Sequence, residues 1–228
     1  MAGAARSLTD LFSIFGGRRA PEGDATADAP ASPQEPLYPT KALATFFKVL
    51  QSRDKPTLID LGPVVGSNVT FFGEHLGCRI RVEDVAADIE RHHKAGNLNE
   101  LATFFKSRFP QESESIDGIL CWDVLDFLER PAALALASAL SRLLRPDGAL
   151  LGFFSTAEGR AQVYTKYLVV DEVSLRYRTY PSSVSRQKSL LNRDIIKMFD
   201  GLRVTDSFLM KNNVREILFR KPAYLAGR

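Results

Sequence analysis

The stretch Asp60-Leu61-Gly62-Pro63-Val64-Val65-Gly66-Ser67 decides the fold of this chain. It follows a short apolar run over residues 57–61 and precedes a segment with helical periodicity over 68–76. A glycine at such a strand-to-helix turn lets the backbone bend sharply and approach a ligand, and free N–H groups at the start of a helix favour electronegative atoms. The pattern therefore predicts a ligand site at the carboxyl end of this strand.

Outward from this turn, helical and strand patterns alternate. Continuous apolar runs in the strands indicate burial on both faces, as in a parallel sheet covered by helices, so we expect an α/β protein with a doubly wound, mostly parallel sheet. An alternating ribbon over 173–178 and a terminal antiparallel hairpin, 202–209 and 214–220, complete it. The expected helices are 41–51, 68–76, 85–92, 98–108, 131–144 and 192–199, and the other strands are 57–61, 78–82, 116–122 and, after a turn over 145–148, 149–154.

The second predicted strand ends in two acidic residues, Glu83 and Asp84. Rossmann-like folds commonly place a carboxylate here, where it accepts hydrogen bonds from the two hydroxyls of a ribose. A solvated strand end is the structural alternative. If the functional interpretation holds, the site selects nucleoside ligands.

Four segments resemble class I S-adenosylmethionine-dependent methyltransferases, a Rossmann-like family, and the resemblance extends over residues 41–222. Asp60-Leu61-Gly62 with Gly66 resembles the family's glycine-rich loop, although Val64 takes the place of its middle glycine. Glu83 stands at the ribose-binding position. The other two segments are the fourth-strand stretch 116–125 and the turn 144–150 before the fifth strand.

The resemblance implies S-adenosylmethionine as the cofactor. Gly62 and Gly66 are then expected against its methionine part and ribose, and Asp60 is expected to help hold the amino group indirectly. Glu83 is expected to bind the ribose. Asp84 is the fallback ligand, and Trp122 completes the expected cofactor-binding set.

Two departures from the family pattern concern the same cofactor. Val64, preceded by Pro63, puts a Cβ and a rigid ring where the cofactor usually meets bare backbone. Phe105, in a helical pattern, occupies the position of the acidic residue that often binds the adenine amine. Phe104 or Phe105 could stack on adenine, but aromatic residues at helical spacing are more typical of a core.

Methyl transfer requires mainly that an acceptor be aligned with an already activated methyl group. Asp123, directly after the fourth strand, is the candidate catalytic residue, either orienting the acceptor or taking its proton. Its alternative is a helix cap. The aromatic and basic segment 164–180 either contributes to an acceptor site or covers a sheet edge.

We therefore expect S-adenosylmethionine-dependent methyl transfer to an unidentified acceptor. The alternative is a catalytically inactive, methyltransferase-like binding or scaffold protein, in which the loop around Val64 no longer admits the cofactor.

The net charge of +3 combines −5 over residues 1–159 with +8 over 160–228. This basic third could attract an anionic partner, but a solvated surface explains it as well, and nucleic acid is not an expected partner.

Metal and disulfide chemistry have little support in the sequence. Cys78 and Cys121 each lie in an apolar run, and His92-His93 has no partner at ligand spacing, so no metal site is expected. No run of residues is apolar enough to span a bilayer. A cytoplasmic location is expected.

The amino-terminal part divides into three expected regions: a short amphipathic helix within 1–19, a disordered Pro- and Ala-rich linker over 20–40, and a methyltransferase-like domain over 41–228. The helix could dock on its own domain, contact a partner or membrane surface through residues 7–19, or be a frayed terminus.

Overall fold

The computed structural model describes residues 36–157, 162–187 and 189–223. The amino-terminal helix expected within 1–19 and most of the expected linker lie outside these residues. The described chain starts close to strand β1 (Tyr38–Pro39), which pairs antiparallel with β7 (Ser174–Pro181). Residues 38–39, which were expected to belong to the linker, form this strand.

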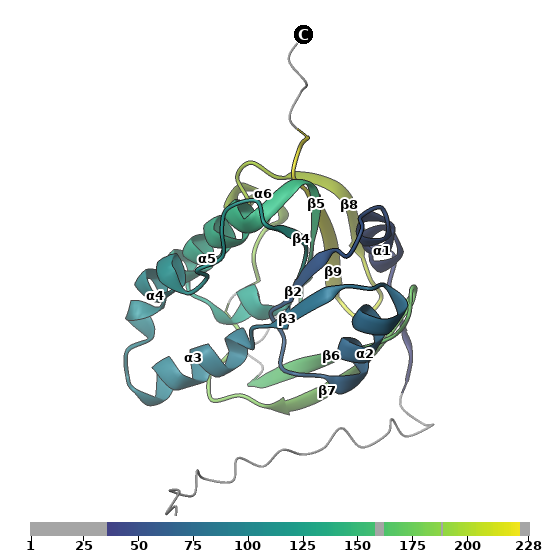
Figure 1. Ribbon diagram of the computed structural model, residues 1–228. Helices are drawn as coiled ribbons and strands as arrows, with labels where there is room; N and C mark the ends of the chain where they lie inside the picture. The colour runs from purple at the N-terminus through teal and green to yellow at the C-terminus, as the bar shows by residue number, and fades with distance from the viewer. Residues whose placement is uncertain (1–35, 158–161, 188, 224–228) are drawn as a thin grey trace, which may run out of the picture. The chain divides into compact units, whose positions relative to one another are not determined.

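The central sheet has the strand order β3-β2-β4-β5-β9-β8 (Figure 1). The pairs β2–β3, β2–β4 and β4–β5 are parallel, whereas β9 pairs antiparallel with both β5 and β8. This confirms the predicted α/β class, the mostly parallel sheet and the terminal hairpin. The strands are β2 (Thr57–Asp60), β3 (Arg79–Val82), β4 (Ile116–Trp122), β5 (Leu144–Ser155), β8 (Arg203–Leu209) and β9 (Val214–Arg220).

Both faces of this sheet are buried, and successive residues of one strand serve opposite cores. Ile59 packs with helices α3, α4 and α5, while its neighbour Leu58 packs with α1. Likewise, Ile119 belongs to the same core as Ile59, and Leu120 belongs to the same core as Leu58. This explains why the central strands β2, β4 and β5 carry long apolar runs, whereas the edge strands β3 and β8 alternate. The helices are α1 (Leu43–Gln51), α2 (Gly66–Thr70), which continues as a π-helical turn (Phe71–His75), α3 (Val85–Lys94), α4 (Leu101–Ser107), α5 (Arg130–Leu143) and α6 (Asn192–Met198).

The segment between β3 and β4 contributes helices and, among the described residues, no strand. A 3-10 turn (Leu98–Glu100) leads into α4, whose Leu101 and Phe105 are buried in the core shared with α5. Phe105 is thus a core residue and is not available to stack on a nucleoside. The aromatic and aliphatic residues at helical spacing decide this outcome.

The prediction that residues 145–148 form a separate turn before the strand was wrong. These residues belong to β5, which pairs with β4 at Leu144 and again at Ala149 with an irregular register between. Asp147 has a φ of 60° there. The turn residues therefore form a bulge inside the strand, because an inserted stretch kinks a strand without ending it.

A second, three-stranded sheet with the order β1-β7-β6 contains the ribbon expected near 173–178. Its strand β6 (Val163–Asp171) is held by Asn68 of α2: the amide Nδ2 donates to the carbonyl of Tyr167 at 2.8 Å, and Oδ1 accepts from the N–H of Val169 at 2.8 Å. One side chain thus satisfies two backbone groups of an edge strand. These contacts fix the hairpin beside the carboxyl ends of β2 and β4.

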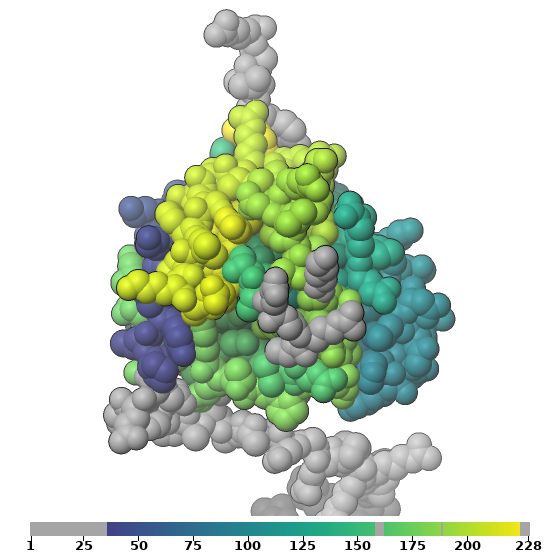
Figure 2. Space-filling model, turned by 180° about the vertical axis from the view of Figure 1, so that it is seen from behind, coloured from purple at the N-terminus to yellow at the C-terminus, as the bar shows by residue number. Residues whose placement is uncertain are grey.

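The carboxyl-terminal hairpin also fixes the start of α1. Glu216 of β9 accepts hydrogen bonds through Oε2 from the hydroxyl of Thr40 at 3.1 Å and from the N–H groups of Lys41 and Ala42 at 2.9 and 3.1 Å. In Figure 2 the purple start of the described chain accordingly lies against the yellow β8–β9 hairpin.

Within the described residues, no helix has the length and apolar character needed to cross a bilayer.

Candidate functional site

Asp60, the last residue of β2, is 2% exposed, and one of its carboxylate oxygens accepts two hydrogen bonds. Its Oδ1 accepts from the N–H of Gly62 at 2.9 Å and from the indole Nε1 of Trp122 at 2.6 Å. Desolvation by burial raises the pKa of Asp60 to about 6, although these hydrogen bonds act in the opposite direction. The charged form therefore depends on these donors.

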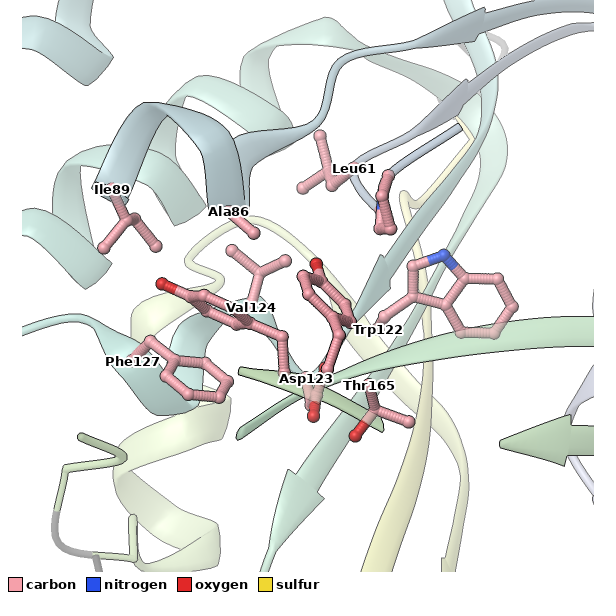
Figure 3. A pocket seen from close by; sticks show the side chains of 12 residues that line it. Leu61, Ala86, Ile89, Trp122, Asp123, Val124, Phe127 and Thr165 are labelled. Carbon is pink, nitrogen blue, oxygen red and sulfur yellow. The ribbon is translucent and has the colours of Figure 1, made fainter. Parts of the chain in front are cut away.

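Side chains from the strand ends, α3 and the β6–β7 hairpin line a small cleft next to Leu61, Gly62 and Pro63, the loop that follows Asp60 (Figure 3). We call this place the strand-end cleft. Its volume is about 10 Å³, which is room for one water molecule. It is lined by Leu61, Gly62, Pro63, Ala86, Ile89, Trp122, Asp123, Val124, Phe127, Tyr164, Thr165 and Tyr180.

The glycine-rich loop meets the cleft through Gly62 and Pro63. Val64 is 65% exposed and does not line the cleft, so its side chain is not what fills the site. A Cβ at Gly62 would lie 3.1 Å from Cδ1 of Trp122. The bare backbone of the loop therefore faces the indole ring. Gly66 opens α2 and lies outside the lining.

Glu83 and Asp84 do not line the cleft. The carboxylate of Glu83 accepts from Nη1 of Arg108 at 2.8 Å and from Nε2 of Gln111 at 3.3 Å. Asp84, with a φ of 33°, caps α3 by accepting from the N–H of Ala87 at 3.2 Å, and desolvation raises its pKa. Both carboxylates thus serve the fold where the family pattern implies ribose binding.

These contacts allow a test of whether the residues present fit S-adenosylmethionine. The carboxylate expected near its amino group already accepts two N–H donors, and the carboxylate expected at its ribose is held by Arg108. Pockets for molecules of this size measure roughly 300–1,000 Å³, whereas the cleft measures about 10 Å³. The side chains as arranged do not fit this cofactor.

Asp123, the candidate catalytic residue, lies at the junction of the cleft with a second cavity. It does not cap the 3-10 helix that follows it (Val124–Phe127) with its side chain. Its carboxylate pairs with Nη2 of Arg186, whose Nη1 donates to Asp126 at 2.6 Å. Burial raises the pKa of Asp123, and burial with the neighbouring charge of Asp123 raises that of Asp126 to about 7.

Sequence reasoning missed Arg186 and Asp126. Arg186 lies 63 residues after Asp123 in a segment without periodic structure, and no local pattern connects the two. Its guanidinium also lies over the ring of Phe127, with its carbon 4.7 Å from the ring centroid. The ion pair thus depends on a tertiary contact that sequence spacing could not reveal.

The second cavity, which we call the tyrosine pocket, has a volume of about 330 Å³. Tyr38 and Tyr177 stack in its wall with ring centroids 4.1 Å apart, and Tyr167 meets Tyr177 edge-on at 5.0 Å. Part of the segment 164–180 therefore does form a cavity wall. The lining comprises Tyr38, Asp123, Ser155, Ala157, Thr165, Tyr167, Tyr177, Arg186, Asn212 and Val214.

The remaining candidate groups lie apart from both cavities. Cys78 and Cys121 are buried free thiols, and desolvation raises the pKa of each. Nδ1 of His92 lies 2.9 Å from the carbonyl oxygen of Asp88, and its ring packs on Phe104. Among the described residues no cluster of three His, Cys, Asp or Glu side chains could hold a metal ion.

No protein-family model and no curated protein sequence matches the chain. Three solved structures illustrate what it resembles. The 1,6-didemethyltoxoflavin-N1-methyltransferase of Burkholderia thailandensis, with 1,6-didemethyltoxoflavin and S-adenosylhomocysteine bound, is 15% identical over 79% of this chain and 78% of that chain, with a TM-score of 0.46. The CcbJ methyltransferase of Streptomyces caelestis is 14% identical over 78% and 94%, with a TM-score of 0.47. The cyclase SpnF is 11% identical over 79% and 81%, with a TM-score of 0.47.

These similarities concern the fold. The bound S-adenosylhomocysteine is a property of the Burkholderia thailandensis enzyme.

Proposed function

Because this chain has the class I methyltransferase fold but fills the cofactor position of that fold with its own side chains, we propose that it is a non-catalytic protein that binds a small planar ligand in the tyrosine pocket. The observation that carries the proposal is the difference between the two cavities: about 10 Å³ in the strand-end cleft and about 330 Å³ in the tyrosine pocket. A fold hosts many functions, so the open cavity is the better guide.

The lining of the tyrosine pocket supports a planar ligand with polar substituents. Tyr38, Tyr167 and Tyr177 contribute aromatic rings to its wall, and planar aromatic groups also pack on such rings edge to face. Asp123 and Arg186 lie at its wall as a buried ion pair, and Thr165 adds a hydroxyl group. A few convergent polar groups within aromatic walls are typical of small-molecule sites.

Calorimetric titration of the full chain with S-adenosylhomocysteine tests the closed cleft. We expect no binding, because the acceptor groups on Asp60 and Glu83 are engaged internally. The variant Val64→Gly restores the family's loop glycine and should behave like the wild type, since Val64 lies outside the cleft lining. Micromolar binding to the wild type would refute the proposal.

Phenol serves as a probe of the tyrosine pocket. In NMR spectra of ring-labelled tyrosines, millimolar phenol should shift the signals of Tyr167 and Tyr177. The signals of Tyr164 and Tyr180, which line the strand-end cleft, should stay in place. Equal shifts in all four residues would mean that the pocket has no selectivity and would count against the proposal.

S-adenosylmethionine-dependent methyl transfer is the second candidate function, and one observation favours it. Asp123 and Thr165 line both the strand-end cleft and the tyrosine pocket. A methyl donor in the first and an acceptor in the second would therefore be neighbours, with Asp123 between them. This candidate requires the cleft to open, and the titration with S-adenosylhomocysteine separates it from the first.

A further inference from the structure

Trp122 has a backbone conformation that bulky side chains rarely adopt. It is the last residue of β4, its φ is 47°, and it is 3% exposed. A left-handed conformation at a large residue persists only where the surroundings hold it, and such residues gather at functional sites. The question is which contacts hold this side chain.

Three contacts from three different elements hold the indole ring. Nε1 donates to Oδ1 of Asp60 at 2.6 Å. One face stacks on Tyr167 of β6, with ring centroids 4.9 Å apart and an angle of 6° between the planes. Phe153 of β5 meets the ring edge-on at 5.4 Å. These contacts therefore fix both the position and the orientation of the indole ring.

The indole also occupies the space next to the bare backbone of the loop. A Cβ at Gly62 would come within 3.1 Å of Cδ1 and 3.2 Å of Nε1 of Trp122. Asp60 Oδ1 accepts one N–H from Gly62 and one from the indole. The ring thus fills space beside the loop and supplies a donor to the buried carboxylate at the same time.

We propose that Trp122 is a built-in occupant of the strand-end cleft, whose indole N–H takes the position on Asp60 that a ligand's N–H donor or cationic group would take. This inference rests on the proposed function, because it takes the closed strand-end cleft to be the state of the protein without a ligand. It adds that removing this side chain opens space beside the loop, with Asp60 as a defined hydrogen-bond acceptor.

Trp122 is the chain's single tryptophan, so the intrinsic fluorescence of the full-length protein reports on this side chain alone. We expect native protein to resist collisional quenching by acrylamide, because the indole is enclosed. Addition of S-adenosylhomocysteine should leave both emission and quenching unchanged. Quenching in native protein as strong as in urea-unfolded protein would overturn the proposal.

The variant Trp122→Gly removes the ring and suits a positive φ. Free indole should then raise its melting temperature in a concentration-dependent way, while 1-methylindole, which lacks the N–H, should raise it much less. Phe199→Ala is the matched control, since it removes a buried ring that packs at a tilt against Phe219 in the opposite core. In Phe199→Ala, indole and 1-methylindole should change the melting temperature equally. Failure of Trp122→Gly to prefer indole would overturn the proposal.

A second route does not require that the cavity variant fold well. Trp122→Phe keeps an aromatic ring and loses the N–H donor. In a double-mutant cycle, its stability loss should be larger in the wild-type background than in an Asp60→Ala background, which has no acceptor for the indole N–H. Equal losses in both backgrounds would show that the indole N–H does not act on Asp60 and would overturn the proposal.

The two proposals fail in different ways. Micromolar binding of S-adenosylhomocysteine to the wild type would refute the non-catalytic function, while a preference of Trp122→Gly for indole would still support the occupant. Absence of binding together with no preference for indole in Trp122→Gly would refute the occupant and leave the non-catalytic function intact.

Discussion

Arg108 holds Glu83 by two hydrogen bonds: Nη1 reaches Oε2 at 2.8 Å, and Nη2 reaches the backbone carbonyl at 2.9 Å. Its Nε also donates to Asp88 at 2.8 Å. Arg108 comes directly after α4, in the segment that forms helices between β3 and β4. The helical path of this segment therefore places the arginine that holds the carboxylate expected at the ribose.

The first prediction concerns Arg108. Arg108→Ala leaves the largely buried carboxylates of Glu83 and Asp88 without this cation, so we expect a loss of about 2 kcal/mol in the free energy of unfolding, reduced for the partial exposure of the arginine. Arg91→Ala is the control, because Arg91 is 63% exposed and pairs with Asp88 alone. Its loss should stay below about 1 kcal/mol. Equal losses in urea denaturation would contradict the prediction.

The second prediction concerns the dependence of stability on pH. Asp126 has a folded-state pKa of about 7 against an ordinary value of 3.8, so the folded chain binds more protons than the unfolded chain between these values. The free energy of unfolding should therefore fall as pH rises through this window.

Asp126→Asn removes the titrating group and should make this fall shallower by up to a few kcal/mol, since one pKa unit corresponds to about 1.4 kcal/mol. Asp60, whose pKa is raised to about 6, keeps a fall of the same sign in the variant. Urea denaturation at several pH values between 4 and 8 measures the effect. Parallel curves for the two proteins would rule it out.

A third prediction concerns Glu216, which is 1% exposed and caps α1 from β9. Glu216→Ala removes the acceptor of three donors, two of them backbone N–H groups at the helix start, so we expect a loss of about 2 kcal/mol. Glu216→Gln retains an acceptor oxygen and should lose about 1 kcal/mol or less. The ratio of the two losses in thermal denaturation is the measurement, and an equal loss would show that charge alone matters.

The last prediction compares two glycines. A Cβ at Gly118 of β4 would lie 2.7 Å from Leu50 Cδ2 and 3.0 Å from Phe46 Cζ, so Gly118→Ala forces α1 away from the sheet. We expect a loss of about 2 kcal/mol. At Gly73, in the π-helical turn after α2, a Cβ would meet nothing within 4 Å. Gly73→Ala should be neutral or stabilising by up to about 1 kcal/mol. A loss of stability in Gly73→Ala with none in Gly118→Ala would contradict the prediction.

The sequence by itself determined the fold. The apolar strand over 116–122 and the helix over Asn192–Met198 were predictable because side-chain periodicity is a local property, and burial on both sheet faces follows from continuous apolar runs. The terminal hairpin was predictable for the same reason, since its turn residues separate two apolar runs. The bulge at 145–148 was not, because turn residues have the same local signature inside a strand as between elements.

Only the tertiary structure decided the site. The sequence placed Asp60, Gly62 and Trp122 near one strand end, but it could not show that the indole would donate to the carboxylate from 62 residues away. It placed Glu83 at a strand end without revealing that Arg108 would hold it. A side chain's hydrogen-bond partner depends on distances between elements far apart in the chain, and these distances exist only once the elements are packed.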